Sequence, residues 1–167
     1  TAEALAAHRT LRRIEPPATL EGGDVLACGR RVFVGLSSRS DPAAVEQLRV
    51  ALAPHGYAVA GVPLRGCLHL KTAVTEVAPG LLLLNPDWVA PRLFAPLEWL
   101  AVDPAEPMAA NGLRVGETLL YPAAFPGTRA RLAARGLGVR ALELDELAKA
   151  EGAVTCCCLL LRLAATS

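Results

Sequence analysis

The sequence predicts an α/β fold built from repeated units, and three observations support this. A theme of strand, helix and strand occurs about three times in the same order. Asp, Pro or Gly stands near the start of each expected helix. The 167 residues, of which 53% are hydrophobic and 20% charged, can bury a real core. We therefore expect one domain over residues 1–167.

The first copy of the theme is the clearest. Residues 32–36 are apolar and β-branched, as in a buried strand. Asp41-Pro42 opens a helix that runs to about Leu52, and a second strand is expected at 57–62. A short helix is also expected upstream of this copy, from Ala2 to His8.

The second and third copies keep the same order. Their strand, helix and strand are expected at 81–84, 91–100 and 100–102, and at 118–121, 127–135 and 139–144. A glycine stands just after the first and third helices, as C-terminal capping preferences predict.

Charge and hydropathy exclude several classes of partner. The net charge of +1 comes from 17 basic and 16 acidic residues that are largely interspersed, so no broad field attracts nucleic acid. No apolar run approaches the roughly 20 residues of a membrane span, and we expect no leader of basic and then apolar residues before the fold. We expect a cytoplasmic protein. The chain starts at Thr1 in what looks like mid-helix, which suggests a fragment or a processed chain.

The five cysteines do not form a disulfide or zinc pattern. Three of them are consecutive, at Cys156, Cys157 and Cys158, and this spacing suits neither bridges nor tetrahedral clips. Reduced thiols are the simpler interpretation, and neither a metal nor a cofactor is expected. The run 154–161 is typical of a buried strand, in which cysteine is a common small hydrophobe.

A functional alternative exists for Cys156. A thiol attacks only as the thiolate, so a catalytic cysteine needs an imidazole nearby, which in turn needs a carboxylate to fix its tautomer. His69 and Cys156 each follow the last strand of a unit, and Glu21 lies in a glycine-containing turn before another. A ring of such units would bring all three residues to one end of a central axis.

Five separated segments carry a resemblance to a known family. In chain order they are LEGGDVL, GRRVFVGLSSR, LHLK, MAAN and LDELAKAEGAVTCC. Together they resemble the dimethylarginine dimethylaminohydrolase family of the guanidino-group-modifying superfamily. The resemblance implies an α/β propeller, or pentein, made of ββαβ modules around a pseudo-five-fold axis. About three modules are present, so it also implies the C-terminal portion of such a propeller with the N-terminal modules missing.

The resemblance assigns the catalytic roles. Cys156 would attack the central guanidinium carbon of a methylated arginine, and His69 would protonate the departing methylated amine. His69 would then act as base on water, which releases citrulline from the covalent thiouronium. Glu21 would orient His69 and stabilise its charge.

The resemblance also assigns substrate contacts. Arg39 would clamp the substrate α-carboxylate, and the backbone carbonyl of Ala150 would accept from the α-amine. Asp24 would either face the site or hydrogen-bond the turn, and we favour the structural role. The family's acidic segment that holds the guanidinium has no counterpart in this sequence, so the site as given is incomplete.

The residues after the histidine bear on specificity. Arginine deiminases and amidinotransferases typically read His-x-Asp, whereas this chain reads His69-Leu70-Lys71. An ammonium in place of the carboxylate cannot bind two unsubstituted guanidinium nitrogens of the substrate, and this favours methylarginine. Two alternatives stay open: a deiminase-like enzyme that acts on another guanidino compound, and a catalytically silent binding relative. The partners expected are the small-molecule substrate and either a second copy of the chain or the missing modules.

Overall fold

The computed structural model describes residues 2–150 and 152–160, and its strands form three three-stranded sheets. The first module contains β1 (Val25–Cys28), β2 (Arg31–Leu36), α2 (Pro42–Leu52) and β3 (Ala58–Pro63). The second contains β4 (Val74–Ala78), β5 (Leu81–Leu84), the 3-10 turn η3 (Pro91–Phe94) and β6 (Glu98–Ala101). The third contains β7 (Leu113–Val115), β8 (Thr118–Pro122), α4 (Pro126–Ala134) and β9 (Gly138–Leu142).

Short elements connect these modules or flank them. They are α1 (Ala2–Ala6), η1 (Gly22–Asp24), η2 (Ala53–His55), α3 (Leu70–Ala73), α5 (Asp145–Ala148) and η4 (Val154–Cys157). The predicted α/β class and the order strand, helix, strand are confirmed. In the second module the helical segment is only a single 3-10 turn.

Each module begins with a tight hairpin. The two residues between its first and second strands include a glycine of positive φ, at Gly29 (57°), Gly80 (76°) and Gly116 (61°). Glycine adopts this conformation without steric cost. The first two strands pair antiparallel, and the chain then crosses over to add a third strand parallel to the second. The modules are therefore ββαβ units.

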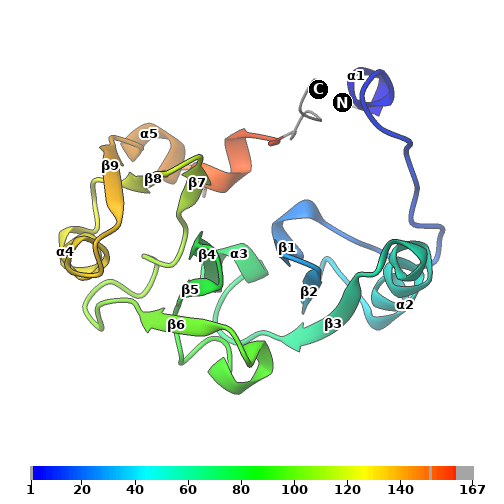
Figure 1. Ribbon diagram of the computed structural model, residues 1–167, viewed down its shortest axis with the longest axis horizontal. Coiled ribbons are helices and arrows are strands. Elements are labelled where there is room, and N and C mark those ends of the chain that lie inside the picture. The colour runs from blue at the N-terminus through cyan, green and yellow to red at the C-terminus, as the bar shows by residue number, and fades with distance from the viewer. Residues whose placement is uncertain (1, 151, 161–167) are drawn as a thin grey trace.

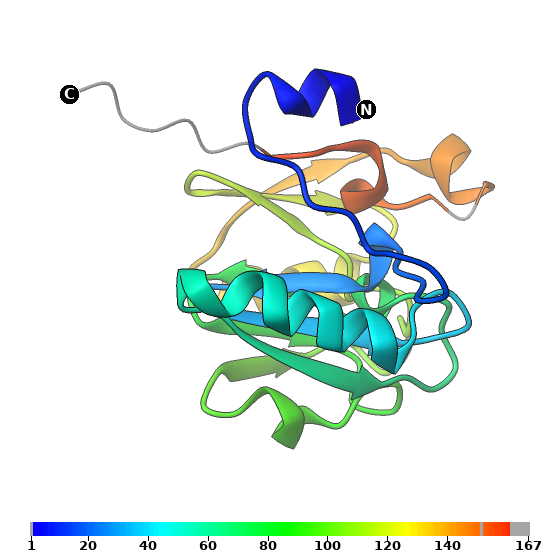
Figure 2. The same ribbon diagram turned by 90° about the vertical axis from the view of Figure 1, so that its right-hand side faces the viewer.

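The three modules follow one another along an open arc (Figure 1). The first strands β1, β4 and β7 lie on the inner side of the arc, whereas α2 and α4 lie on the outside. Seen from the side, α2 lies across the outer face of the first sheet (Figure 2). Asp41 caps this helix, because its Oδ1 accepts from the Ala44 amide at 2.8 Å. No helix in the described ranges is long and apolar enough to cross a membrane.

The middle strands explain why the modules pack together. Side chains alternate between the two faces of a strand, and both faces of β2 and β5 are buried. Val32 and Val34 face the cluster beneath α2, while Phe33 packs toward the second module. Leu83 faces the third module, so apolar cores fill both junctions of the arc.

Two sequence predictions are wrong in part. The helix expected over 91–100 ends at Phe94, because Pro96 disfavours helical geometry at Ala95, whose ψ is 140°. The buried strand expected over 154–161 is instead the 3-10 turn η4, followed by exposed residues up to 160. Leu161 lies outside the described residues.

Candidate active site

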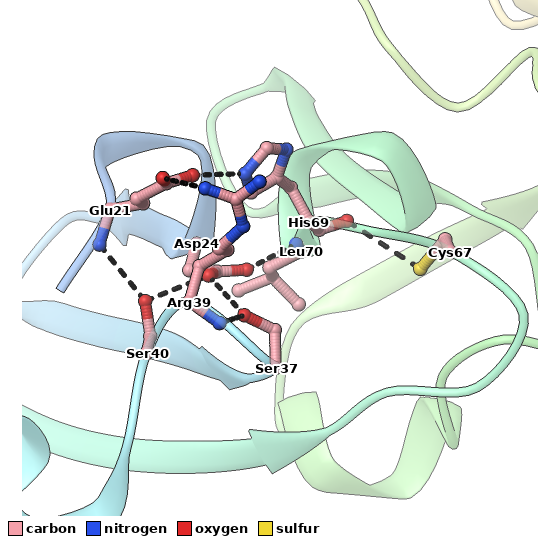
Figure 3. A network of polar contacts seen from close by, with 8 residues as sticks. All are labelled: Glu21, Asp24, Ser37, Arg39, Ser40, Cys67, His69 and Leu70. Carbon is pink, nitrogen blue, oxygen red and sulfur yellow. Dashed lines mark hydrogen bonds and ion pairs between the residues drawn. The ribbon is translucent and has the colours of Figure 1, made fainter. Parts of the chain in front are cut away.

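Glu21 and His69 form the centre of the candidate site. His69 Nε2 lies 2.5 Å from Glu21 Oε2, although 48 residues separate the two in sequence (Figure 3). Glu21 stands just before η1, and His69 stands just before α3 in the connection from β3 to β4. A carboxylate can only accept, so the ring hydrogen lies on Nε2, and Nδ1 is the nitrogen left for proton transfer.

Arg39 shares the carboxylate of Glu21. Its guanidinium lies 3.2 Å from Glu21 Oε1, on the other oxygen from His69. The hydrogen bond from His69 lowers the pKa of Glu21, burial opposes this shift without cancelling it, and the Arg39 charge lowers the pKa further. Glu21 is therefore ionised at neutral pH and can stabilise positive charge on the imidazole.

Gly23 makes room for the imidazole. A Cβ added to Gly23 would lie 2.7 Å from His69 Cγ and 2.8 Å from Cδ2, which is shorter than real contacts allow. A Cβ added to the neighbouring Gly22 would meet nothing within 4 Å. The ring therefore packs directly on the backbone of the Gly-Gly turn, and Glu21 fixes its polar edge.

Asp24 is fully buried beneath this pair. Its Oδ2 accepts from the hydroxyls of Ser37 and Ser40, each at 2.7 Å. Its Oδ1 accepts from the Leu70 amide at 2.9 Å, directly after His69 (Figure 3). Ser40 Oγ also accepts from the Glu21 amide at 3.0 Å. Asp24 thus ties the segments of Glu21 and His69 to the turn that follows β2, and its oxygens are occupied by protein groups.

The four cysteines whose side chains are described differ sharply in environment. Cys156 lies in η4 and is exposed, as is Cys158. Burial raises the pKa of Cys28 to about 12 and that of Cys67 to about 11, with nearby carboxylates adding to both shifts. Cys67 lies next to the site, where its thiol contacts the His69 carbonyl oxygen at 3.5 Å. Cys28, which is buried, and Cys67, which is half-buried, are therefore poor nucleophiles.

Lys71 connects the histidine segment to the cysteines electrostatically. It lies on α3, two residues after His69. Burial lowers the pKa of Lys71, while the negative charges of the Cys156 and Cys158 thiolates oppose that shift. An ammonium therefore lies within electrostatic range of both exposed thiols.

The predicted substrate contacts have different positions in the structure. Arg39 and Glu21 border an open hollow of 700 Å³, which has room for a small ligand. Ala150 lies in the turn after α5 in the third module, and its amide donates to the Leu147 carbonyl at 3.0 Å. The arc separates α5 from β2, which precedes Arg39 (Figure 1). Within the described ranges, no group of three or more His, Cys, Asp or Glu is arranged to hold a metal ion.

The structure adds residues that sequence reasoning missed. Ser37 and Asn111 occur in the segments GRRVFVGLSSR and MAAN, whereas Ser40 lies outside all five segments. Asn111 binds both the Lys71 carbonyl and Thr155, the residue before Cys156. The segment resemblance was the only sequence signal for Ser37 and Asn111, because hydrogen bonds between distant residues leave no local pattern.

The chain is similar to known proteins over most of its length. The family model described as "Arginine deiminase" matches residues 5–110. N(G),N(G)-dimethylarginine dimethylaminohydrolase of Streptomyces coelicolor is 40% identical over 147 residues, which are 87% of this chain and 56% of that protein. The enzyme of the same name from Pseudomonas aeruginosa is 32% identical over 146 residues, 87% of this chain and 58% of that protein. The chain thus spans a little over half the length of these relatives.

A solved structure supports the fold. It is the dimethylarginine dimethylaminohydrolase of Pseudomonas aeruginosa, a cysteine-to-serine mutant complexed with citrulline. It superposes with a TM-score of 0.80 at 28% identity and covers 92% of this chain and 63% of the other. The predicted propeller of ββαβ modules is thereby confirmed. The family model matches more than half of the residues and shows that the chain belongs to the arginine deiminase family, within which the relatives and the solved structure that it resembles carry the name dimethylarginine dimethylaminohydrolase.

Proposed function

We propose that this chain carries the acid–base and nucleophile half of a hydrolase that removes methylated amine from N-omega-methylated arginine. The observation that carries the proposal is the contact of 2.5 Å between His69 Nε2 and Glu21 Oε2. A histidine that a carboxylate holds in one tautomer suits general acid and base catalysis. The relatives and the citrulline complex supply the reaction class.

Cys156 is the proposed nucleophile. It is exposed on η4. The negative charge of its thiolate raises the pKa of Lys71, which follows His69 by two residues. Attack of the thiolate on the guanidinium carbon forms a C–S bond, and loss of the amine then breaks a C–N bond. His69 gives the leaving amine a proton, and Glu21 stabilises the charged imidazole. His69 next removes a proton from water, whose oxygen displaces the sulfur and yields citrulline.

Substrate binding is proposed for Arg39 and Ala150, and a positioning role for Asp24. Arg39 pairs with Glu21 without substrate, so binding of an α-carboxylate would have to draw its guanidinium toward the 700 Å³ hollow. The carbonyl of Ala150 is proposed to accept from the α-amine. Asp24 binds the turn and the Leu70 amide, which keeps the side chains of Glu21 and His69 next to each other.

Lys71 supports the choice of methylarginine over arginine. A carboxylate at this position would hold two unsubstituted guanidinium nitrogens, whereas an ammonium cannot accept a hydrogen bond from either of them. We also propose a reducing, cytoplasmic location, because Cys156 and Cys158 are exposed and free. Further modules or a second copy of the chain are proposed to complete the guanidinium pocket.

Citrulline release tests the proposal. Asymmetric dimethylarginine, monomethylarginine and arginine are supplied to this chain and to a longer protein that includes upstream modules. Methylarginine turnover that Cys156→Ser abolishes and Cys158→Ser spares is the expected result. Preference for arginine would instead support a deiminase, since the matched family model carries that description. No citrulline from either folded protein would overturn the enzyme proposal and favour a binding role.

A further inference from the structure

Asn111 is a buried amide with most of its hydrogen-bonding capacity used. Its side chain lies in the connection between β6 and β7 and is 5% exposed. Nδ2 donates to the Lys71 carbonyl at 2.8 Å and to Thr155 Oγ1 at 2.9 Å, and Oδ1 accepts from the Thr155 amide at 3.2 Å. A single nitrogen therefore joins the segment that carries His69 to the segment that carries Cys156.

The backbone around Asn111 is held from both neighbouring modules. Thr75 of β4 donates its hydroxyl to the Ala110 carbonyl at 2.7 Å and accepts from the Gly112 amide at 3.1 Å. Tyr121 of β8 donates its hydroxyl to the Ala109 carbonyl at 2.5 Å. These contacts are buried, so the position of the amide is set by the packing of the second module against the third.

We propose that Asn111 is a positioning residue that holds the Cys156 segment against the segment of His69 and Lys71. The proposal rests on the proposed function for the roles of Cys156 and His69. On the other side, the Leu70 amide is bound to Asp24, which leads back to Glu21 through Ser40. Asn111 thus extends the fixed network from the carboxylate and imidazole to the thiol.

Lys71 gives this arrangement a chemical consequence. Burial lowers the pKa of its ammonium, so the charged form costs stability at neutral pH, and that cost disappears as the pH rises toward the usual lysine value. Burying a charge in a fold is tolerated where function uses it. An ammonium held near Cys156 attracts the thiolate, and Asn111 fixes the backbone on both sides of that pair.

A double-mutant cycle on thiol reactivity tests the proposal without requiring turnover. Alkylation of Cys156 by iodoacetamide is followed by peptide mass spectrometry, with N-acetylcysteine in the same tube as a reference for the reagent. Lys71→Met should slow alkylation roughly 3- to 10-fold in the parent chain and less than about 2-fold in Asn111→Ala. Equal slowing in both backgrounds would mean that Asn111 only stabilises the fold, and would overturn the proposal. No slowing in the parent would also overturn it.

Conservative variants keep the test valid if Asn111→Ala unfolds. Asn111→Asp can still accept from Thr155 but cannot donate to the Lys71 carbonyl. Lys71→Met should therefore slow the alkylation of Cys156 less in this background than in the parent chain. Thr155→Val removes the hydroxyl and should also reduce the slowing of alkylation by Lys71→Met, whereas Thr155→Ser keeps the hydroxyl and should preserve that slowing. Melting temperatures exclude global unfolding. Where citrulline is formed, Asn111→Asp should lower kcat about 10-fold with KM changed less than about 2-fold, because only the reacting groups move. Citrulline formation without Lys71 coupling would overturn this inference and leave the proposed function standing.

Discussion

The imidazole of His69 is fixed by two different kinds of contact. A carboxylate oxygen of Glu21 holds Nε2 at 2.5 Å, and the backbone of Gly23 supports the ring from below. The first contact sets the tautomer, and the second sets where the ring lies. Both residues come from the same turn, so the short LEGGD segment defines the acid–base group of a histidine 48 residues away.

Replacement of Gly23 by alanine should displace the ring. The new Cβ would lie 2.7 Å from His69 Cγ, so the imidazole must shift from Glu21. We expect Gly23→Ala to lower citrulline formation about 100-fold, since misplacement by about 1 Å costs that much in well-ordered sites. The imidazole NMR signals of His69 should shift as well, and they can be assigned because the chain has three histidines.

The neighbouring glycine provides the control. A Cβ on Gly22 meets nothing within 4 Å, so Gly22→Ala should retain activity within about 3-fold and leave the His69 signals in place. Equal losses in the two variants would show that the turn needs glycine for flexibility and not for contact with the ring.

Thiol accessibility gives a second prediction at this scale. Iodoacetamide at pH 8 should modify Cys156 and Cys158 in the folded chain and leave Cys28 unmodified, because Cys28 is buried and its pKa is raised to about 12. Cys67, with a pKa raised to about 11, should react slowly. Peptide mass spectrometry measures all four sites, and denaturant should make them equally reactive. Rapid labelling of Cys28 in folded protein would contradict the burial described above.

At the scale of elements, hydrogen bonds from buried side chains join one module to the next. Thr75 on β4 bridges the backbone on both sides of Asn111. Thr75→Val keeps the shape but leaves a buried carbonyl and a buried amide without that partner. We expect a loss of about 2–3 kcal/mol in the free energy of unfolding, measured by urea titration.

Thr75→Ser is the matched variant, since it retains the hydroxyl and loses only a methyl group. It should cost about 1 kcal/mol. If serine destabilises the chain more than valine does, packing of the methyl group dominates at this junction, and the bridge contributes little.

The sequence predicts the central strands of this fold better than their inner neighbours. Apolar runs such as 81–84 stand out because both faces of β5 are buried. The pattern does not predict the first strand of each module, since β4 places Thr75 and Glu76 among its apolar residues and β7 has only 3 residues. The two-residue turns with Gly29, Gly80 and Gly116 were the available signal for these hairpins.

Elsewhere the fold depends on contacts that no local pattern contains. The apolar run from 154 suggested a strand, but the Thr155 amide donates to Asn111 in place of a neighbouring strand. The pairing of Glu21 with His69 could be anticipated from residue types and from the resemblance, and the structure brings these two side chains together. The carboxamide of Asn111 could not be anticipated, because any buried Asn has the same sequence signature.

At the scale of the whole molecule, carboxylates that receive backbone hydrogen bonds make stability depend on pH. The amides of Ala44 and Thr19 lower the pKa of Asp41. Burial raises the pKa of Glu106, but the stronger combined effect of the Thr128 and Gly127 amides lowers it overall. Both groups bind protons more weakly in the folded chain than in the unfolded chain. Their stabilisation is therefore complete above the usual carboxyl pKa values, 3.8 for Asp and 4.5 for Glu, and is lost on acidification through the lowered ones.

We therefore expect a constant melting temperature between about pH 6 and 7 and a progressive fall below about pH 4.5. Asp41→Asn and Glu106→Gln should lower the melting temperature at pH 7 and reduce its dependence on pH. Calorimetry from pH 3 to pH 7 measures both effects. A fall centred between pH 6 and 7 would point to histidine and contradict this assignment.

The candidate site draws on every junction of the arc. Glu21 and His69 are 48 positions apart, and Asn111 and Thr155 are 44 apart. Contacts between such distant residues form late, because the intervening loops must close first. The chemistry is consequently coupled to completion of folding. A chain with one module undocked still contains Glu21, His69 and Cys156, but these side chains are not aligned with one another. Thiol reactivity at Cys156 would then serve as an internal reporter of correct assembly.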